Sequence, residues 1–217
     1  MKKSSVVPLV MLGLFLLPFL IYLFLFFGTE QKFERVPFQY TIMENGDTAY
    51  HSFPNFTLNN LYGDSIRRSD LEGKICLLGF FSVNDDSLKK TTVLFGNLKR
   101  VYDNIDWEKN PSFQFVFVNM GDNPEEVKAF VNSLEVDTQK WMFLSGEQDE
   151  IYKLAMGGFV FPDFIRKAPG DAPFTAQTVV MTDKSGKARN YYIATDLQQE
   201  RTILEDFIAL LRVDYGL

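Results

Sequence analysis

The feature that most restricts the fold is an apolar run near the middle of the chain, KICLLGFFSV, from Lys74 to Val83. A nearly continuous apolar segment of this length is typical of a strand that is buried on both faces of a sheet, as central parallel strands are. A second run of this kind, FQFVFVNM, covers Phe113–Met120. These two runs predict an α/β domain built around a largely buried sheet.

Helix and strand patterns alternate around these two runs. An apolar repeat of three or four residues predicts a helix at Ser87–Tyr102, and Asn123 with Pro124 is typical of the start of another. WMFLSG, from Trp141, predicts a short strand, and a hairpin turns at residues 184–186. With a final helix after this hairpin, the order predicts an α/β fold around a mixed sheet.

The N-terminus carries a different signal. Residues 6–27 include no charge, and at about 1.5 Å per residue they span roughly 33 Å, enough for a hydrocarbon core of about 30 Å. Lys2 and Lys3 precede this run and Glu30 follows it, which places the N-terminus in the cytoplasm. The run therefore predicts a single-pass transmembrane anchor.

A cleaved signal peptide is the alternative interpretation of this run. The apolar core of a signal peptide usually has about 7–15 residues and ends in a small-x-small site, and Gly28-Thr29-Glu30 does not match that pattern. We therefore expect an uncleaved anchor. The predicted organisation is a cytoplasmic N-terminus (1–5), the anchor (6–27), a polar spacer with a strand in FQYTI (28–52), and one folded domain (53–217).

Charge and cysteine content exclude several functions for the part beyond the anchor. Without Lys2 and Lys3 it carries 20 basic and 28 acidic residues, a net charge of −8, which argues against binding nucleic acid or anionic lipid. Cys76 is the only cysteine, so the chain cannot form an internal disulfide or run a two-thiol cycle. Its place in the apolar run predicts a small buried hydrophobe.

Several segments of the domain, in this order, resemble one family. They are FPNFTLNN and GDSIRRSDLEGKICLLGFFS at the front, WMFLSGEQDEIYKLA in the middle and TVVMTDKSGKARNYY near the end. Over residues 53–212 the chain resembles the thioredoxin-like superfamily, and within it the Sco/SenC family of copper-delivery proteins. The resemblance implies a thioredoxin-like mixed sheet flanked by helices, on the periplasmic side of a bacterial inner membrane.

The same resemblance locates the family's copper ligands. Members that bind copper have two cysteines separated by three residues at a strand–helix junction, and a histidine before the later hairpin strand; thiolates and imidazole suit copper ions. Matching Thr91-Thr92 and the helix behind them puts the first cysteine at Asp85 and the second at Lys89. The histidine position falls on Thr175. We therefore expect no catalytic, cofactor-binding or metal-binding residue and no cofactor.

Other residues with chemical potential have ordinary structural explanations. Asp85 and Asp86 could bind a hard cation, but Lys89 would repel it, so we interpret them as acids at the start of a helix. His51, the only histidine, is expected to be exposed in the spacer. Four methionines are expected to pack in the core rather than to bind copper: Met120, Met142, Met156 and Met181.

The leading hypothesis is a membrane-anchored, redox-inactive Sco-like pseudoenzyme that assists respiratory oxidase assembly by holding a protein partner. One alternative is a redoxin-type thiol oxidoreductase that uses Cys76, although Lys74 is the only basic residue close to it in sequence. Another is a pure interaction module that presents Phe159, Phe161 and Phe164 from a long loop at residues 157–173. The same loop could equally be a lid that packs on the core.

Overall fold

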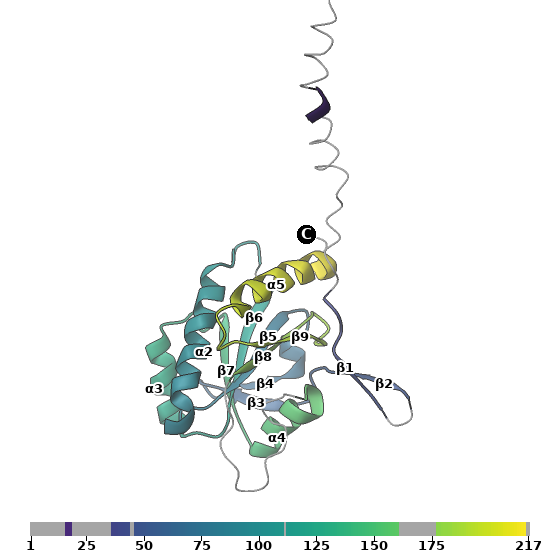
Figure 1. The fold of residues 1–217 in the computed structure, drawn as a ribbon. Helices are drawn as coiled ribbons and strands as arrows, with labels where there is room; N and C mark the ends of the chain where they lie inside the picture. Colours follow the sequence, from purple (N-terminus) through teal and green to yellow (C-terminus); the bar gives the residue numbers. More distant parts are fainter. Residues whose placement is uncertain (1–15, 19–35, 44–45, 111, 161–176, 216–217) are drawn as a thin grey trace, which may run out of the picture. The chain divides into compact units, whose positions relative to one another are not determined.

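A computed structural model describes residues 16–18, 36–43, 46–110, 112–160 and 177–215 of the chain (Figure 1). It contains two units, residues 1–34 and residues 35–217. The predicted anchor lies outside the described residues except for a helical turn at residues 16–18. No helix in the described ranges has both the length and the apolar character that crossing a membrane requires.

The larger unit is built on a seven-stranded mixed sheet with the order β4-β3-β7-β6-β5-β8-β9. Strands β5, β6 and β7 are parallel, whereas β8 is antiparallel to β5 and β3 is antiparallel to β7. All residues of β5 and β6 are buried, as the two apolar runs predict, and all residues of β8 are buried as well. The strand bounds are β3 Thr57–Asn60, β4 Ser65–Arg67, β5 Ile75–Phe81, β6 Phe113–Asn119, β7 Trp141–Ser145, β8 Thr178–Thr182 and β9 Ala188–Ile193.

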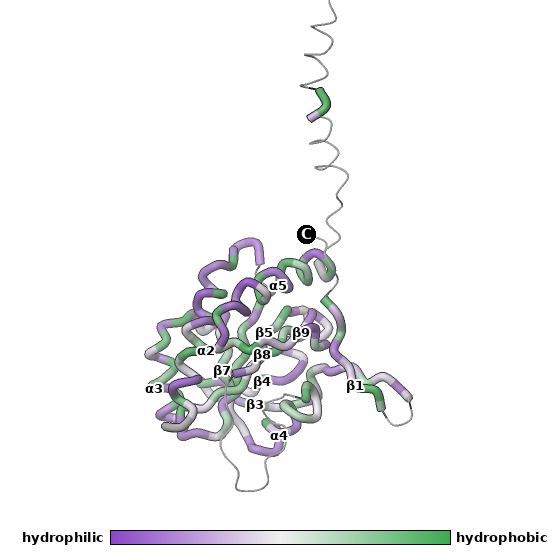
Figure 2. The backbone as a smooth tube through the Cα atoms, in the orientation of Figure 1, coloured by the Kyte–Doolittle hydropathy of each residue, from purple (hydrophilic) through white to green (hydrophobic). Residues whose placement is uncertain are grey.

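Helices cover both faces of this sheet. Side chains of the three longest helices form one buried cluster with one face, and the short helices pack with the other. In Figure 2 the central strands are mostly green, while the helices alternate between green and purple, as amphipathic helices do. The helix bounds are η1 Arg68–Leu71, α2 Asp85–Asp103, α3 Pro124–Leu134, α4 Gln148–Tyr152, the π-helical segment η2 Lys153–Gly158, and α5 Gln199–Tyr215.

Strand alternation explains how one sequence fills two cores. In β6, Phe113, Phe115 and Phe117 belong to the cluster under α2, α3 and α5, whereas Val116 and Val118 belong to the opposite cluster. The ring of Trp141 on β7 stacks on Phe115 with a centroid distance of 4.3 Å and an interplanar angle of 5°. The abundant phenylalanines therefore stabilise mainly the face that α2, α3 and α5 cover.

Residues 36–52, which fall in the predicted spacer, belong to the folded unit. They form a two-stranded ribbon of β1 (Tyr40–Ile42) and β2 (Thr48–Tyr50), so the strand predicted in FQYTI is present. The backbone N–H of Gln39 donates to the carbonyl of Ala188 on β9 (3.0 Å), and the N–H of Ala188 donates to the carbonyl of His51 (2.7 Å). The sequence did not reveal this contact because strands of three residues have no readable period and the bonds are between backbone atoms.

Candidate functional site

The site expected from the family resemblance is the corner at which β5 leads into α2, formed by Ser82, Val83 and Asn84. The side chain of Asn84 caps the helix, because its oxygen accepts a hydrogen bond from the N–H of Ser87 at 3.0 Å. The buried hydroxyl of Thr91, two turns into α2, donates to the carbonyl of Ser82 at 2.7 Å. Local capping and one buried hydrogen bond thus fix the path from strand to helix.

Asp122, in the loop after β6, connects this corner to the neighbouring strand. Its carboxylate accepts hydrogen bonds from the hydroxyl of Ser82 (2.9 Å), the N–H of Val83 (2.8 Å) and the amide of Asn119 (2.8 Å). The side-chain oxygen of Asn119 accepts in turn from the N–H groups of Gly121 and Asp122. This network joins the carboxyl ends of β5 and β6, where open α/β sheets commonly place their sites.

Gly121 in the same loop lies against the side chain of Gln148, the first residue of α4. The amide of Gln148 donates to the carbonyl of Met120 at 2.8 Å. A Cβ on Gly121 would lie 2.0 Å from the Gln148 nitrogen, and the φ of Gly121 is +100°. The backbone conformation therefore requires glycine here, whereas the end of the flexible Gln148 side chain could move aside for a Cβ.

The three predicted ligand positions are only partly described. Helix α2 begins at Asp85, although the side chain of Asp85 lies outside the described part of the structure. Lys89 is exposed on the first turns of α2, and Thr175 lies outside the described residues. The chain has one cysteine and one histidine, and the structure describes both of them at other places.

Cys76 lies near the start of β5 and not at the corner. Its side chain is 0% exposed, and its Sγ contacts the carbonyl oxygen of Lys74 at 3.9 Å. Burial raises the pKa of the Cys76 thiol to about 12, although the Lys74 charge and the Thr182 hydroxyl act in the opposite direction. A thiol that is both buried and protonated is a poor nucleophile, which argues against the redoxin-type alternative.

His51 is half-buried rather than exposed, contrary to the sequence expectation. Its Nε2 lies 2.8 Å from the hydroxyl of Thr41, and its Nδ1 lies 3.0 Å from the hydroxyl of Tyr191 on β9. The Tyr191 hydroxyl donates to the carbonyl of Phe159, so it accepts from Nδ1–H and leaves Nε2 to accept from Thr41. Burial lowers the pKa of His51. Folding of residues 36–52 onto β9 explains the difference.

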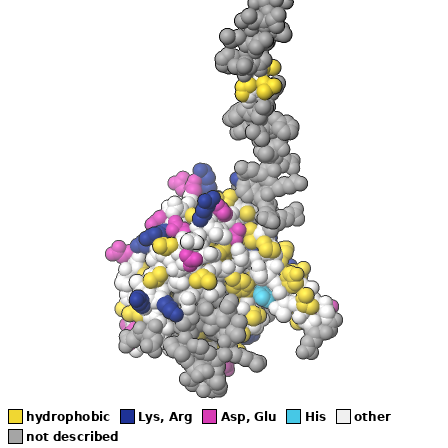
Figure 3. All heavy atoms as spheres, viewed as in Figure 1, with side chains coloured by type: hydrophobic (Ala, Val, Ile, Leu, Met, Phe, Trp, Pro, Cys, Tyr) yellow, Lys and Arg dark blue, Asp and Glu magenta, His cyan; other side chains and the backbone are white. Residues whose placement is uncertain are grey.

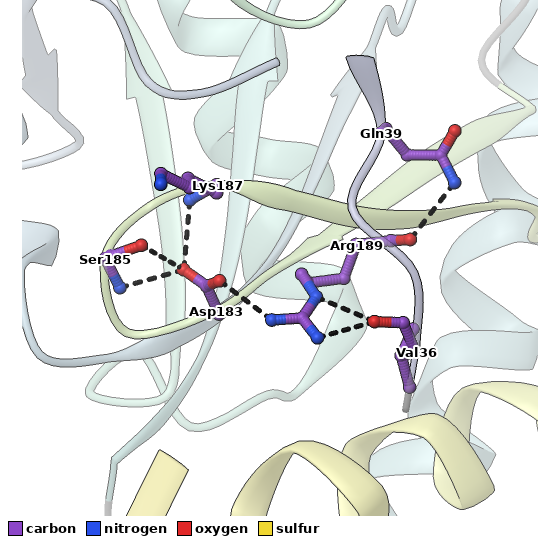
Figure 4. A network of polar contacts seen from close by, with 6 residues as sticks. All are labelled: Val36, Gln39, Asp183, Ser185, Lys187 and Arg189. Atoms are coloured by element: carbon purple, nitrogen blue, oxygen red, sulfur yellow. Dashed lines mark hydrogen bonds and ion pairs between the residues drawn. The ribbon is translucent and has the colours of Figure 1, made fainter. Parts of the chain in front are cut away.

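A second polar cluster lies where the β8–β9 turn meets the N-terminal segment (Figure 4). The guanidinium of Arg189 pairs with Asp183 at 3.1 Å and donates through Nε (3.0 Å) and Nη2 (2.5 Å) to the carbonyl of Val36. Asp183 also accepts from the N–H and hydroxyl of Ser185 and from the N–H of Lys187. Every contact in this cluster is structural: it closes the turn and holds Val36.

The remaining sequence candidates are core residues. Phe159 is fully buried and packs edge-on against Phe53 with a centroid distance of 4.9 Å, which fits the lid interpretation, whereas Phe161 and Phe164 lie outside the described residues. The methionines pack in the two hydrophobic clusters, as expected: Met181 in one, and Met120, Met142 and Met156 against the other. Within the described ranges, no three His, Cys, Asp or Glu side chains are grouped to hold a metal ion.

The residues that shape the corner were not identified from the sequence. The segment NMGDNPEE indicates a helix start at Asn123 but gives no sign that Asp122 reaches back to Ser82. Arg189 was likewise missed, because its partner Val36 is 153 residues away in the sequence. A carboxylate three residues after a buried strand, at the carboxyl edge of a parallel pair, is the one signal that could have identified Asp122.

The solved structures that this chain resembles share its fold. A SCO1/SenC family lipoprotein from Bacillus anthracis matches with a TM-score of 0.63 and 22% identity, covering 74% of this chain and 95% of that one. BsSco, described as a member of the Sco family of cytochrome c oxidase assembly proteins, matches with a TM-score of 0.60 and 21% identity over 76% and 95%. The apo Sco1 protein from Thermus thermophilus matches with a TM-score of 0.55 and 23% identity over 75% and 93%.

These similarities confirm the predicted thioredoxin-like mixed sheet flanked by helices, and they show that Sco proteins are among the structural neighbours of the chain. No family model matches the sequence, and no curated protein does. At these identities the likeness shows the fold, and activity must be argued from the residues.

Proposed function

We propose that this protein is a membrane-anchored Sco-like pseudoenzyme that assists assembly of a respiratory oxidase by binding a protein partner, without thiol or copper chemistry of its own. All three structural neighbours reported above carry Sco names, and the name of one of them also refers to cytochrome c oxidase assembly. The observation that carries the proposal is the position of Cys76. The chain's only thiol lies inside β5, fully buried, instead of at the corner.

The corner supports a binding role in a second way. Ser82, Asn119 and Thr91 are buried there and all make hydrogen bonds within the protein, so none of them is free to serve as a ligand or base. A fully hydrogen-bonded polar network makes a segment rigid. A rigid corner suits a surface that a partner recognises.

A copper-binding measurement tests the claim that the protein has no copper chemistry of its own. Purified full-length protein in detergent is titrated with cuprous copper against a chromogenic chelator, and we expect no stoichiometric binding. The matched positive control is the triple variant Asp85→Cys, Lys89→Cys, Thr175→His, which restores the three family ligands by resemblance and is expected to gain copper. Tight one-to-one binding by the wild-type protein would refute the copper-free role.

Genetic complementation tests the claim that the protein assists oxidase assembly. In a strain that lacks the gene, we expect reduced oxidase activity, restored equally by the wild-type protein and by Cys76→Ala. Normal oxidase activity in the deletion strain would contradict a role in assembly. Failure of a folded Cys76→Ala protein, when the wild-type protein restores activity, would show instead that the thiol takes part in the reaction.

The proposal places residues 6–27 as a single-pass anchor in a bacterial inner membrane, with the folded unit in the periplasm. The absence of charge in this segment and the lysines before it support this topology. We expect the protein to remain in the membrane pellet after alkaline carbonate treatment. Protease added to spheroplasts should digest the domain, and a protected domain would reverse the topology.

A further inference from the structure

One face of the β1–β2 ribbon is apolar. The strands pair Tyr40 with Tyr50 and Ile42 with Thr48, and side chains alternate between the two faces of a strand, so Tyr40, Ile42 and Tyr50 share one face. Phe38, two residues before Tyr40, belongs to the same face, and its ring meets that of Tyr50 edge-on at a centroid distance of 5.6 Å. We call Phe38, Tyr40, Ile42 and Tyr50 the aromatic face.

The aromatic face is open to solvent in the described part of the structure. Its four side chains are exposed by 41%, 53%, 68% and 49% in the order given, and Figure 3 shows hydrophobic side chains over the ribbon. The other face of the ribbon has a different character, because Gln39 and His51 there hydrogen-bond to β9. Contiguous exposed apolar side chains on a soluble domain usually mark a surface that binds something.

Charge around this face is also distinctive. The ammonium of Lys187 lies 5.0 Å from the ring centroid of Tyr50 and 5.5 Å from that of Phe38. The four side chains of the aromatic face are uncharged, although the chain beyond the anchor has a net charge of −8 and Asp47 lies in the turn between β1 and β2. Aromatic and aliphatic side chains beside one lysine are the composition that proteins place at the boundary between lipid headgroups and acyl chains.

Chain length restricts what can cover this face. The uncharged run ends at Phe27, and Phe38 follows eleven positions later. Even fully extended, eleven residues reach at most about 40 Å. If residues 6–27 cross a bilayer, the aromatic face is therefore held close to the surface of that bilayer, at a very high effective concentration.

We propose that the aromatic face inserts into the interfacial region of the membrane that holds the anchor, and so fixes the distance and orientation of the domain. This inference rests on the anchoring part of the proposed function. The occupant is a phospholipid surface, which binds through apolar contact, so anionic lipid is not required. Docking of this kind would limit the directions from which a membrane-bound partner can approach the domain.

Lipid quenching of a reporter tryptophan tests this inference. The full-length Tyr40→Trp variant is reconstituted into phosphatidylcholine nanodiscs, with or without lipids brominated at shallow acyl positions. The natural tryptophans, Trp107 and Trp141, give a background that the wild-type protein measures. The matched control is Tyr62→Trp, because Tyr62 is 73% exposed on the β3–β4 turn and is not part of the aromatic face.

We expect brominated lipid to quench the added fluorescence of Tyr40→Trp at least twofold, and to leave that of Tyr62→Trp unchanged. Incorporation into nanodiscs without quenching at position 40 would overturn this inference while the proposed anchor stands. Failure to incorporate would overturn the anchor and this inference together. Emission from position 40 that shifts only with protein concentration would assign the aromatic face to a second copy of the chain and would also overturn it.

Discussion

Arg189 and Asp183 form an ion pair in which nitrogen and oxygen are 3.1 Å apart and each side chain is only 5% exposed. The same guanidinium holds the carbonyl of Val36, so one buried residue joins the β8–β9 turn to the N-terminal segment. Arg189 also lies 4.0 Å from the ring centroid of Phe38, at the base of the aromatic face. The ribbon therefore depends on a contact that spans nearly the whole domain sequence.

Replacing this arginine should destabilise the domain strongly. Arg189→Met leaves the Asp183 carboxylate buried without its cation and removes both donors from the Val36 carbonyl, which should lower the free energy of unfolding by about 3–5 kcal/mol. Denaturant unfolding measures this loss. Hydrogen exchange should also show faster exchange at the Gln39 amide, which bonds to Ala188.

The control for this prediction is an arginine in an exposed pair. Arg201 lies 2.6 Å from Glu205, one turn along α5, and its side chain is 86% exposed. Because solvent screens such pairs, Arg201→Met should leave the unfolding midpoint close to that of the wild-type protein. Equal losses for the two variants would show that burial of the Arg189 pair has no special role.

The loop at the corner makes a steric prediction. Gly121→Ala forces a residue at φ +100° and puts its Cβ against the Gln148 amide, so it should cost about 1–3 kcal/mol in the free energy of unfolding. Adding Gln148→Ala should recover only part of this loss, because the backbone strain remains. A full recovery would mean that the contact, and not the conformation, requires glycine.

Gly96 provides the opposite case in the same domain. It lies in α2 with nothing within 4 Å of a Cβ added to it. Gly96→Ala should therefore stabilise the protein by about 0.5–1 kcal/mol, because alanine loses less conformational entropy in a helix. Denaturant unfolding of both glycine variants under identical conditions makes the comparison.

The sequence predicted elements that depend on local pattern and missed contacts that depend on distant residues. Local sequence alone identifies β5 and β6, through their apolar runs, and the start of α3, through the capping residue Asn123. Asp122, which reaches back to Ser82, and Arg189, which reaches Val36, have no such local signal, because their function depends on which loops the fold brings together. The expectation of an exposed His51 failed for the same reason, since Tyr191 lies 140 residues away.

The buried thiol of Cys76 should make the folded protein less stable at alkaline pH. The unfolded thiol loses its proton near pH 9, whereas burial raises the pKa of the native thiol to about 12. Between these values the native state binds the proton more tightly, so stability is complete below pH 9 and falls as pH rises, by up to about 1.4 kcal/mol per pH unit. Unfolding curves of the wild-type protein and Cys76→Ala between pH 8 and 10.5 measure the difference.

Comparison with Cys76→Ala separates the effect of the thiol from that of other groups that lose a proton at alkaline pH. Tyr191 and Tyr192 also have pKa values raised by burial, and they remain in both proteins. The stability of Cys76→Ala should therefore fall less steeply above pH 9 than that of the wild-type protein. Parallel curves would mean that the native thiol ionises normally, and rapid thiol labelling at neutral pH would support the same conclusion.

The half-buried imidazole of His51 should make the folded protein less stable as the pH falls. Burial lowers its pKa in the native state, so the unfolded state takes up a proton first as pH falls below about 6.5. The native state then binds fewer protons, and stability is lost as pH decreases from that value. His51→Gln keeps a polar side chain but cannot titrate, so its stability should depend less on pH between 7 and 5. A variant that loses stability over this range as steeply as the wild-type protein would show that His51 does not contribute to acid sensitivity.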